Sequence, residues 1–231
     1  MGQMIISEKS IAVPGEVLAE GMDYLPGEHT FRDGERIIAM KVGVVGLFGR
    51  QVKLTPLSGP YIPKSGDIVI GEIVGVGIGG WRVNIGWHFE ANLSVKDATS
   101  DFVPRGENLS RYFDYGDYVV CQIVNVGGAK VVDLGMKGPG LRKLGVGRIF
   151  RVPSSKVPRI IGKQGSMISM IKESTGCRIS VGQNGIVWLG SDDPAKEIVA
   201  YKAISKIIDE SHTSGLTEKI KGFLESSKNG L

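Results

Sequence analysis

Ile160-Ile161-Gly162-Lys163-Gln164-Gly165-Ser166-Met167-Ile168 is the stretch of this 231-residue chain that decides its fold. Two apolar residues lead into the turn Gly162–Gly165, and an amphipathic segment follows it. A turn with glycine at both ends lets a sugar-phosphate backbone approach closely, and Lys163 between the glycines adds positive charge. The stretch therefore predicts a contact with single-stranded nucleic acid between two helices. Four residues alone leave open the alternative of an ordinary joint between helices that binds nothing.

The sequence on both sides of the turn favours the first interpretation. Before the turn, the sequence predicts a strand over 147–152 and a connection over 153–158. After it, a helix over 166–174 ends at Gly176, and strands over 177–181 and 186–189 are joined by an Asn184-Gly185 turn. A further helix, capped by Asp193-Pro194, follows. In that last helix we expect the apolar residues to pack on the sheet: Ile198, Tyr201, Ile204, Ile207 and Ile208. The order strand, helix, turn, helix, strand, strand, helix is that of a type I KH domain, which clamps single-stranded RNA at its Gly-x-x-Gly turn.

Positive charge is concentrated around this turn. Residues 141–180 hold nine Lys and Arg residues and one acid, Glu173, so that window is +8, whereas the whole chain is +4 and the remainder is therefore −4. A basic stretch of this kind is typical of a surface that binds a polyanion. The candidate RNA-binding residues of the KH segment are Gly162, Lys163, Gln164, Gly165, Lys156, Arg159 and Arg178, with Arg148 and Arg151 as electrostatic support.

Composition sets the outer limits. Hydrophobic residues make up 42% of the chain, which is enough for packed cores, and no apolar run approaches the roughly 20 residues that span a bilayer. The first residues, Met1 to Lys9, lack the pattern of a secretory leader, so we expect a cytoplasmic protein that does not engage a membrane. Cys121 and Cys177 lie in different predicted strands and domains, which predicts buried thiols and neither a disulfide nor a metal site.

The first two thirds of the chain are predicted to be almost all β. Short Val- and Ile-rich runs alternate with Gly and Pro turns, and within residues 1–60 the predicted strands cover 11–13, 36–47 and 51–57. Residues 66–77 match residues 116–127 at seven of twelve positions, but the sequence between Trp81 and Ser94 has no second copy. This short internal repeat therefore indicates two strands of one barrel rather than tandem domains.

A five-stranded OB barrel fits this middle segment, with predicted strands over 67–76, 81–85, 89–93, 118–126 and 131–136. Such barrels bind single strands by stacking bases on exposed aromatic rings and by tracking phosphates with basic residues. Trp81, followed by Arg82, is the best candidate for that platform. Packing of Trp81 in the barrel core is the alternative.

Two enzyme-like patterns fail on their context. Gly75 to Gly80 satisfies G-x-G-x-x-G, but an alternating strand follows it where a dinucleotide site needs a helix. His88-Phe89-Glu90 resembles half of a zinc deaminase site, yet the required downstream Cys pair is missing, and His29, His88 and His212 are scattered. We therefore expect no catalytic residues, no metal and no cofactor.

Four segments together resemble a known family. They are Val13-Pro-Gly-Glu-Val-Leu-Ala-Glu-Gly21, the S1-like barrel from Gly66, the KH turn, and Glu210-Ser-His-Thr-Ser-Gly-Leu-Thr-Glu-Lys-Ile220. Their combination and order are similar to those of the RNA-binding cap subunits of the archaeal exosome, over essentially the whole chain. The resemblance implies a small N-terminal β docking domain (1–60), an S1-like OB-fold RNA-binding domain (61–140) and a KH domain with C-terminal helices (141–231).

The resemblance also implies a non-catalytic role. Three copies of such a subunit, or copies of it with a related cap subunit, would sit on a hexameric ring of RNase-PH-like subunits, bind single-stranded RNA with a preference for poly(A)-rich substrates, and feed it to the ring for phosphorolysis from the 3′ end. One departure concerns the barrel, because many S1 barrels carry two aromatics on the second strand and a His on the third, whereas this chain has Trp81-Arg82-Val83 and Ala91-Asn-Leu93.

Two other classes share these domains. A polynucleotide phosphorylase-related nuclease would need a catalytic core, which 60 residues before the barrel cannot hold. A transcription or translation factor of the S1 and KH kind usually carries two KH units after its barrel, whereas one Gly-x-x-Gly turn fits here and a short amphipathic helix with Leu216, Ile220, Phe223 and Leu224 follows.

Overall fold

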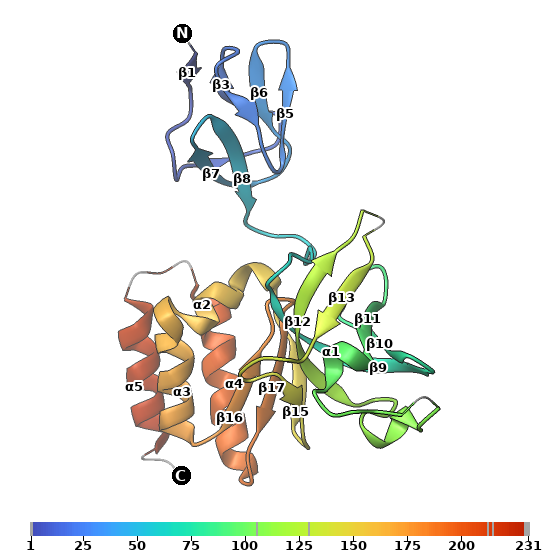
Figure 1. Ribbon diagram of the computed structural model, residues 1–231. Coiled ribbons are helices and arrows are strands. Elements are labelled where there is room, and N and C mark those ends of the chain that lie inside the picture. The colour runs from blue at the N-terminus through green and yellow to red at the C-terminus, as the bar shows by residue number, and fades with distance from the viewer. Residues whose placement is uncertain (1, 105, 129, 212, 214, 229–231) are drawn as a thin grey trace. The chain divides into compact units, whose positions relative to one another are not determined.

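The computed structural model describes residues 2–104, 106–128, 130–211, 213 and 215–228 (Figure 1). The chain forms two compact units, Met1–Pro60 and Tyr61–Leu231. The first unit is entirely β, whereas the second contains a barrel and a mixed α and β segment that pack on each other. The multidomain architecture expected from the sequence, mainly β followed by α+β, is confirmed.

The N-terminal unit has two small sheets. The first has the strand order β1 (Gln3–Met4), β3 (Val17–Glu20), β6 (Arg36–Ala39) and β5 (Thr30–Asp33). The second has the order β2 (Ile11–Ala12), β7 (Gly43–Phe48), β8 (Gln51–Pro56) and β4 (Leu25–Pro26). The single strand predicted over 36–47 is therefore wrong: β6 and β7 belong to different sheets, and the chain turns at 40–42 to pass between them.

The middle segment closes into the predicted five-stranded barrel. Its strands are β9 (Ile68–Gly77), β10 (Gly80–Asn84), β11 (Ala91–Ser94), β12 (Tyr118–Val126) and β13 (Val132–Gly135). β13 pairs in parallel with β11 and antiparallel with β12, so the sheet has no free edge between them. A short strand, β14 (Arg142–Lys143), adds to β12, while α1 (Val95–Ala98) and the 3-10 turn η1 (Leu109–Arg111) lie in the connections.

Strand alternation explains the barrel core. Val69, Val83 and Leu93 point inward and are buried, while Arg82 and Asn92 on the same strands point outward. The glycines 75–80 form the end of β9 and the hairpin to β10, which confirms a hairpin in place of a dinucleotide site. Burial raises the pKa of the Cys121 thiol to about 12, and both cysteines are buried and free, as predicted.

The C-terminal segment has the predicted element order. β15 (Arg148–Arg151), α2 (Val157–Ile161), α3 (Ser166–Thr175), β16 (Arg178–Val181), β17 (Ile186–Gly190) and α4 (Pro194–Asp209) follow one another, and α5 (Leu216–Lys228) is added at the end. The sheet is antiparallel with the order β15-β17-β16. As Figure 1 shows, α3 and α4 lie against one face of this sheet, α5 packs on these two helices, and the barrel lies on the other face.

Capping and apolar spacing position these helices. Asp193 accepts a hydrogen bond from Ala195 N at 2.9 Å at the start of α4, and Gly176 ends α3 in a left-handed conformation, both as the sequence predicts. The predicted apolar face of α4 is partly wrong, since Ile198 is 45% exposed. The helix instead packs through Ala200 and Ala203 with Ile204 and Ile207, because small residues let it approach the sheet closely.

The KH hairpin also joins the sheet to the barrel. Gln183 N donates to Ile68 O at 2.8 Å, and Gln183 Oε1 accepts from Ile68 N at 2.6 Å. Trp188 packs in a small cluster with Ile70 and Leu144, and its indole N–H donates to Gly145 O at 3.1 Å. The barrel and the KH segment are therefore held as one body by backbone pairing as well as by apolar packing.

The described residues contain neither a membrane-spanning helix nor a metal-binding cluster. Within these ranges, every helix is too short or too polar to span a bilayer. In the same part of the chain, no three His, Cys or acidic side chains gather into a group that could hold a metal ion.

Candidate nucleic-acid interface

The Gly162–Gly165 turn has a backbone conformation that its glycines make possible. Gly162 has φ 76° and ψ 174°, a region that residues with a Cβ rarely adopt. A Cβ at this position would lie 2.7 Å from both Cβ and N of Met167, so glycine is also required for packing. The turn therefore brings the end of α2 close to the start of α3, with no side chain at its entry.

The remainder of the turn faces solvent. Lys163 and Gln164 are exposed, and Gln164 is held in a left-handed conformation at φ 54°. Nothing lies within 4 Å of a Cβ built on Gly165, which shows open space above that residue. A sugar-phosphate backbone can therefore approach Gly165 directly.

Positive charge beside the turn is available for a ligand. Arg159 and Lys163 are exposed, and among the described residues neither has an acidic side chain at ion-pair distance. The first turn of α3 also lacks a side-chain cap, so its backbone N–H groups add positive potential. Lys156 differs, since its Nζ donates to Ser211 Oγ at 2.7 Å and thereby ties α2 to the region before α5.

A groove of about 410 Å³ runs beside the turn. Arg159, Lys163 and Ser166 line one side of it, and Thr217 and Glu218 at the start of α5 line the other. The contribution of α5 was missed by sequence reasoning, because the amphipathic spacing of this helix predicts a packed face but does not indicate where its first turn lies.

The other predicted basic residues do not join this group. Arg178 begins β16, at the far end of α3 from the turn, and a ten-residue helix is about 15 Å long. Its guanidinium carbon lies 6.0 Å from the centroid of the Trp188 ring, on the sheet face that is turned away from the helices. The +8 window is therefore not one surface, and the assignment of Arg178 to the clamp is not supported by this geometry.

Arg148 and Arg151 likewise divide between the two faces of the sheet. Arg151 pairs with Ile186, which faces the barrel, whereas Arg148 pairs with Leu189, which faces the helices. Burial and the Glu72 carboxylate raise the pKa of the barrel residue Tyr118. Arg151 is close enough to that phenol to oppose the rise in part. Since strand residues alternate between faces, residues three apart cannot serve the same side.

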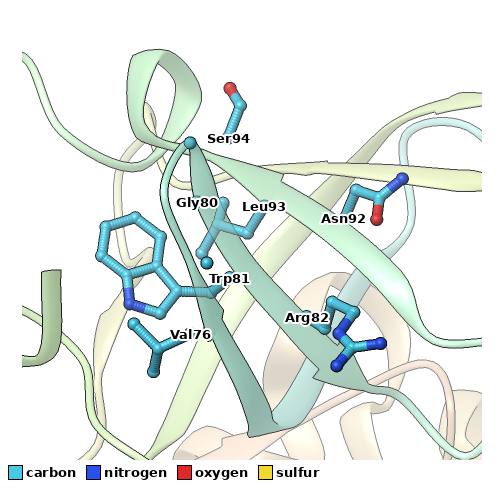
Figure 2. A pocket seen from close by; sticks show the side chains of 9 residues that line it. Val76, Gly80, Trp81, Arg82, Asn92, Leu93 and Ser94 are labelled. Atoms are coloured by element: carbon cyan, nitrogen blue, oxygen red, sulfur yellow. The ribbon is translucent and has the colours of Figure 1, made fainter. Parts of the chain in front are cut away.

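The barrel contradicts the tentative platform at Trp81. The ring is only 2% exposed, its Nε1 donates to Phe113 O at 2.9 Å, and it packs edge-on against the Phe113 ring. Figure 2 shows the Trp81 ring and the Arg82 guanidinium extending in different directions from β10. Trp81 is therefore a core residue, which is the packing alternative that the sequence left open.

Arg82 remains on the surface. It lies across Gly75, and its Nε is 3.4 Å from Glu90 Oε2. Together with Asn92 it lines a shallow pocket of about 440 Å³ over β10 and β11 (Figure 2). Arg82 and Asn92 thus place a charged and an amide side chain on this outer face of the barrel.

Comparisons with known proteins match both the KH segment and the whole chain. The KH domain model matches residues 147–200. The chain is 41% identical over 229 residues to the exosome complex component Rrp4 of Pyrococcus furiosus, covering 98% of this chain and 86% of that protein. It is also 41% identical to the component of the same name from Methanothermus fervidus, covering 96% of this chain and 97% of the relative.

A solved structure gives the same result for the fold. It is described as that of a candidate exosome complex RNA-binding protein, is 35% identical to this chain and superposes with a TM-score of 0.65. The match covers 74% of this chain and 98% of the other.

Proposed function

Since the chain belongs to the Rrp4 family of exosome complex components, we propose that it binds single-stranded RNA as the non-catalytic RNA-binding cap of an exosome and delivers the strand to other subunits. Several exosome Rrp4 components align with nearly the whole chain, and a KH domain lies within it. The fold and the family therefore support RNA binding without chemistry.

The Gly162–Gly165 turn carries this proposal. It combines an exposed Lys163, open space above Gly165 and the uncapped first turn of α3. Lys163 and the free N–H groups of α3 favour a phosphate group over a neutral ligand because they supply positive potential, and the open space lets the phosphate approach. We assign Gly162, Lys163, Gln164, Gly165 and Arg159 to the RNA contact, with Lys156 as a residue that orients α2.

The barrel has a smaller role in the proposal. Arg82 supplies charge on its outer face, and Trp81 supplies packing only. A barrel that binds weakly by itself can still guide a strand if several copies surround one path, because linked weak contacts add through effective concentration. We accordingly propose a trimeric cap, formed by copies of this chain or together with a related cap subunit.

The assembly and its setting complete the proposal. We divide the chain into a docking domain (1–60), the S1-like domain (61–140) and the KH domain with its C-terminal helices (141–231). The docking domain would contact a ring of RNase-PH-like subunits in the cytoplasm, and the cap would pass poly(A)-rich RNA to that ring for 3′ to 5′ phosphorolysis. The many exposed apolar side chains of the first unit, such as Ile11, Met22 and Phe48, support a docking role.

A charge-reversal experiment tests RNA binding. We expect Lys163→Asp to weaken binding of a labelled single-stranded oligonucleotide about tenfold, since a charge-assisted hydrogen bond is worth about 1.5–3 kcal/mol. Lys202→Asp is the matched control, because Lys202 is an equally exposed lysine on α4. Equal effects of the two substitutions would remove the clamp from the proposal.

Two further measurements address the assembly and the lack of chemistry. A pull-down from the source organism should recover RNase-PH-like subunits, whereas recovery of RNA polymerase or ribosomes would contradict the cap. The purified chain should not shorten labelled RNA in phosphate buffer, and phosphate-dependent trimming by the pure chain would contradict the non-catalytic role.

A further inference from the structure

The loop between β10 and β11 presents aromatic side chains on the surface of the barrel. Asn84 Oδ1 accepts a hydrogen bond from Gly86 N at 2.9 Å, and Gly86 adopts φ 77°, so the first turn of the loop is fixed. From the KH hairpin, Asn184 Nδ2 donates to Ile85 O at 2.8 Å. The loop over residues 86–90 is therefore anchored at its start to both the barrel and the KH segment.

Its three aromatic side chains differ in burial. Trp87 packs against the barrel core, and its indole N–H is buried with no acceptor among the described residues, so apolar packing holds the ring. The His88 ring contacts Trp87 with centroids 4.5 Å apart and ring planes tilted by 55°, and His88 is exposed. Phe89 is 57% exposed. The loop thus offers two rings to solvent, one of which contacts a partly buried indole.

An arginine lies at each end of this loop. Arg151 Nη1 is 3.9 Å from the position that a Cβ on Gly86 would occupy, and Arg82 Nε is 3.4 Å from Glu90 Oε2. The nearby carboxylates already have partners, because Glu90 pairs with Arg82 and Glu72 accepts from the Tyr118 hydroxyl at 3.1 Å. Both guanidiniums come from strands that pass beside the loop, so their spacing is set by the fold.

We propose that this loop, defined as residues 86–90, is a second RNA-binding site, at which bases of a single strand stack on Phe89 and His88 while Arg82 and Arg151 contact the flanking phosphates. The proposal rests on the proposed function, because the same strand would occupy the Gly162–Gly165 turn. Exposed rings between guanidinium groups suit single-stranded nucleic acid better than a protein partner, since every base has a stacking face and every linkage has a phosphate.

The site gives the barrel the stacking surface that Trp81 cannot provide. It also gives Arg151 a function that its separation from the clamp otherwise leaves unexplained. Arg82 would exchange the carboxylate of Glu90 for a phosphate when RNA binds. Glu90→Gln should therefore strengthen binding, because it removes a competing anion and leaves the arginine in place.

Matched pairs of variants test the site in the full-length chain, with fluorescence anisotropy of a labelled 15-nucleotide oligo(A) as the measurement. Phe89→Ala should weaken binding about tenfold, within the range measured for removing one stacked base. Phe102→Ala is its control, because Phe102 is 89% exposed in the same barrel but lies in another loop. Arg151→Gln should weaken binding and reduce the dependence of log affinity on log salt by about 0.7, whereas Arg148→Gln on the same strand should change neither.

Each outcome has a distinct meaning. No RNA binding by the unaltered chain would overturn the proposed function itself. If the chain binds RNA and Lys163→Asp weakens it, but Phe89→Ala behaves like Phe102→Ala, the second site is absent and the clamp stands. If Phe89→Ala leaves RNA affinity unchanged but prevents co-purification of exosome subunits, the loop is a protein contact and the proposal is wrong. Circular dichroism melting should show unchanged folding, as expected for an exposed ring.

Discussion

Asn184 pairs with Ile70 through both of its side-chain amide atoms: Nδ2 donates to Ile70 O at 2.7 Å, and Oδ1 accepts from Ile70 N at 3.2 Å. A side chain from the KH hairpin thereby takes the place of a strand backbone beside β9. The same Nδ2 also donates to Ile85 O at 2.8 Å, so one residue bonds both to β9 and to the residue that follows β10. The hairpin loop of the KH sheet is consequently bonded to the barrel.

Replacement of this residue tests the joint. Asn184→Ala should lower the free energy of unfolding of the barrel and KH body by about 2–4 kcal/mol, because backbone groups of Ile70 and Ile85 lose their partners in a partly buried place. Differential scanning calorimetry measures the change. Asn125→Ala is the control, since the Asn125 side chain is exposed and makes only a 3.4 Å hydrogen bond to Asp133. A loss no larger than that of Asn125→Ala would contradict a role of the Asn184 hydrogen bonds in the joint.

The two glycines of the RNA-binding turn should differ in their tolerance of alanine. Gly162→Ala combines a conformation essentially restricted to glycine, which costs about 1–3 kcal/mol, with a clash against Met167. Gly165→Ala meets only the left-handed penalty of about 1–2 kcal/mol, because open space surrounds that position. Urea unfolding should therefore rank Gly162→Ala as the less stable variant. Equal midpoints would contradict the steric requirement at Gly162.

The core assignment of Trp81 gives a third prediction. Trp81→Phe should lower the free energy of unfolding by about 1–3 kcal/mol, since Phe113 O loses its donor and the smaller ring leaves a void. Its RNA affinity, measured by anisotropy well below the melting temperature, should stay within twofold of the unaltered chain. A tenfold loss of affinity without loss of stability would restore Trp81 as a stacking residue.

Cys121 links stability to alkaline pH. Its pKa in the folded chain is about 12, raised by burial from an ordinary value of 9.0. Below pH 9 the thiol is protonated in both the folded and the unfolded chain, and its contribution to stability is fully present. As the pH rises from about 9 towards 12, the thiol ionises in the unfolded chain but not in the folded one, so that contribution is lost. Cys121→Ser should flatten the fall in melting temperature over that range. An unchanged profile would contradict this role of the thiol.

Much of the fold follows from local sequence signals. Turns were predictable because glycine and Asn-Gly occupy the positions that need positive φ, and β9 and β10 were predictable from their alternating apolar residues. The helix start at Asp193-Pro194 followed from capping chemistry. These features depend on a few neighbouring residues, which a sequence shows directly.

The features that could not be predicted depend on contacts between distant segments. Trp81 reads as either a platform or a core residue until Phe113 is known to receive its N–H. The sequence predicted one basic surface that includes Arg151 and Arg178. Arg151 lies on the barrel-facing side of β15, and the length of α3 separates Arg178 from Lys163. Phe89 was expected inside a strand and lies before β11, in the loop that the barrel anchors. A count of basic residues along the chain does not reveal on which face of the folded domain each of them lies.

The hairpin over 182–185 is sterically restricted at both of its glycines. Surface hairpins ordinarily gain and lose residues with little effect, because solvent accommodates the change. Here a Cβ on Gly182 would lie 2.7 Å from Ile70 N, and one on Gly185 would lie 2.2 Å from Val152 O. Neither glycine can therefore gain a side chain without a backbone shift, in β9 of the barrel for Gly182 and directly after β15 for Gly185, so this surface hairpin is as sterically restricted as a core segment.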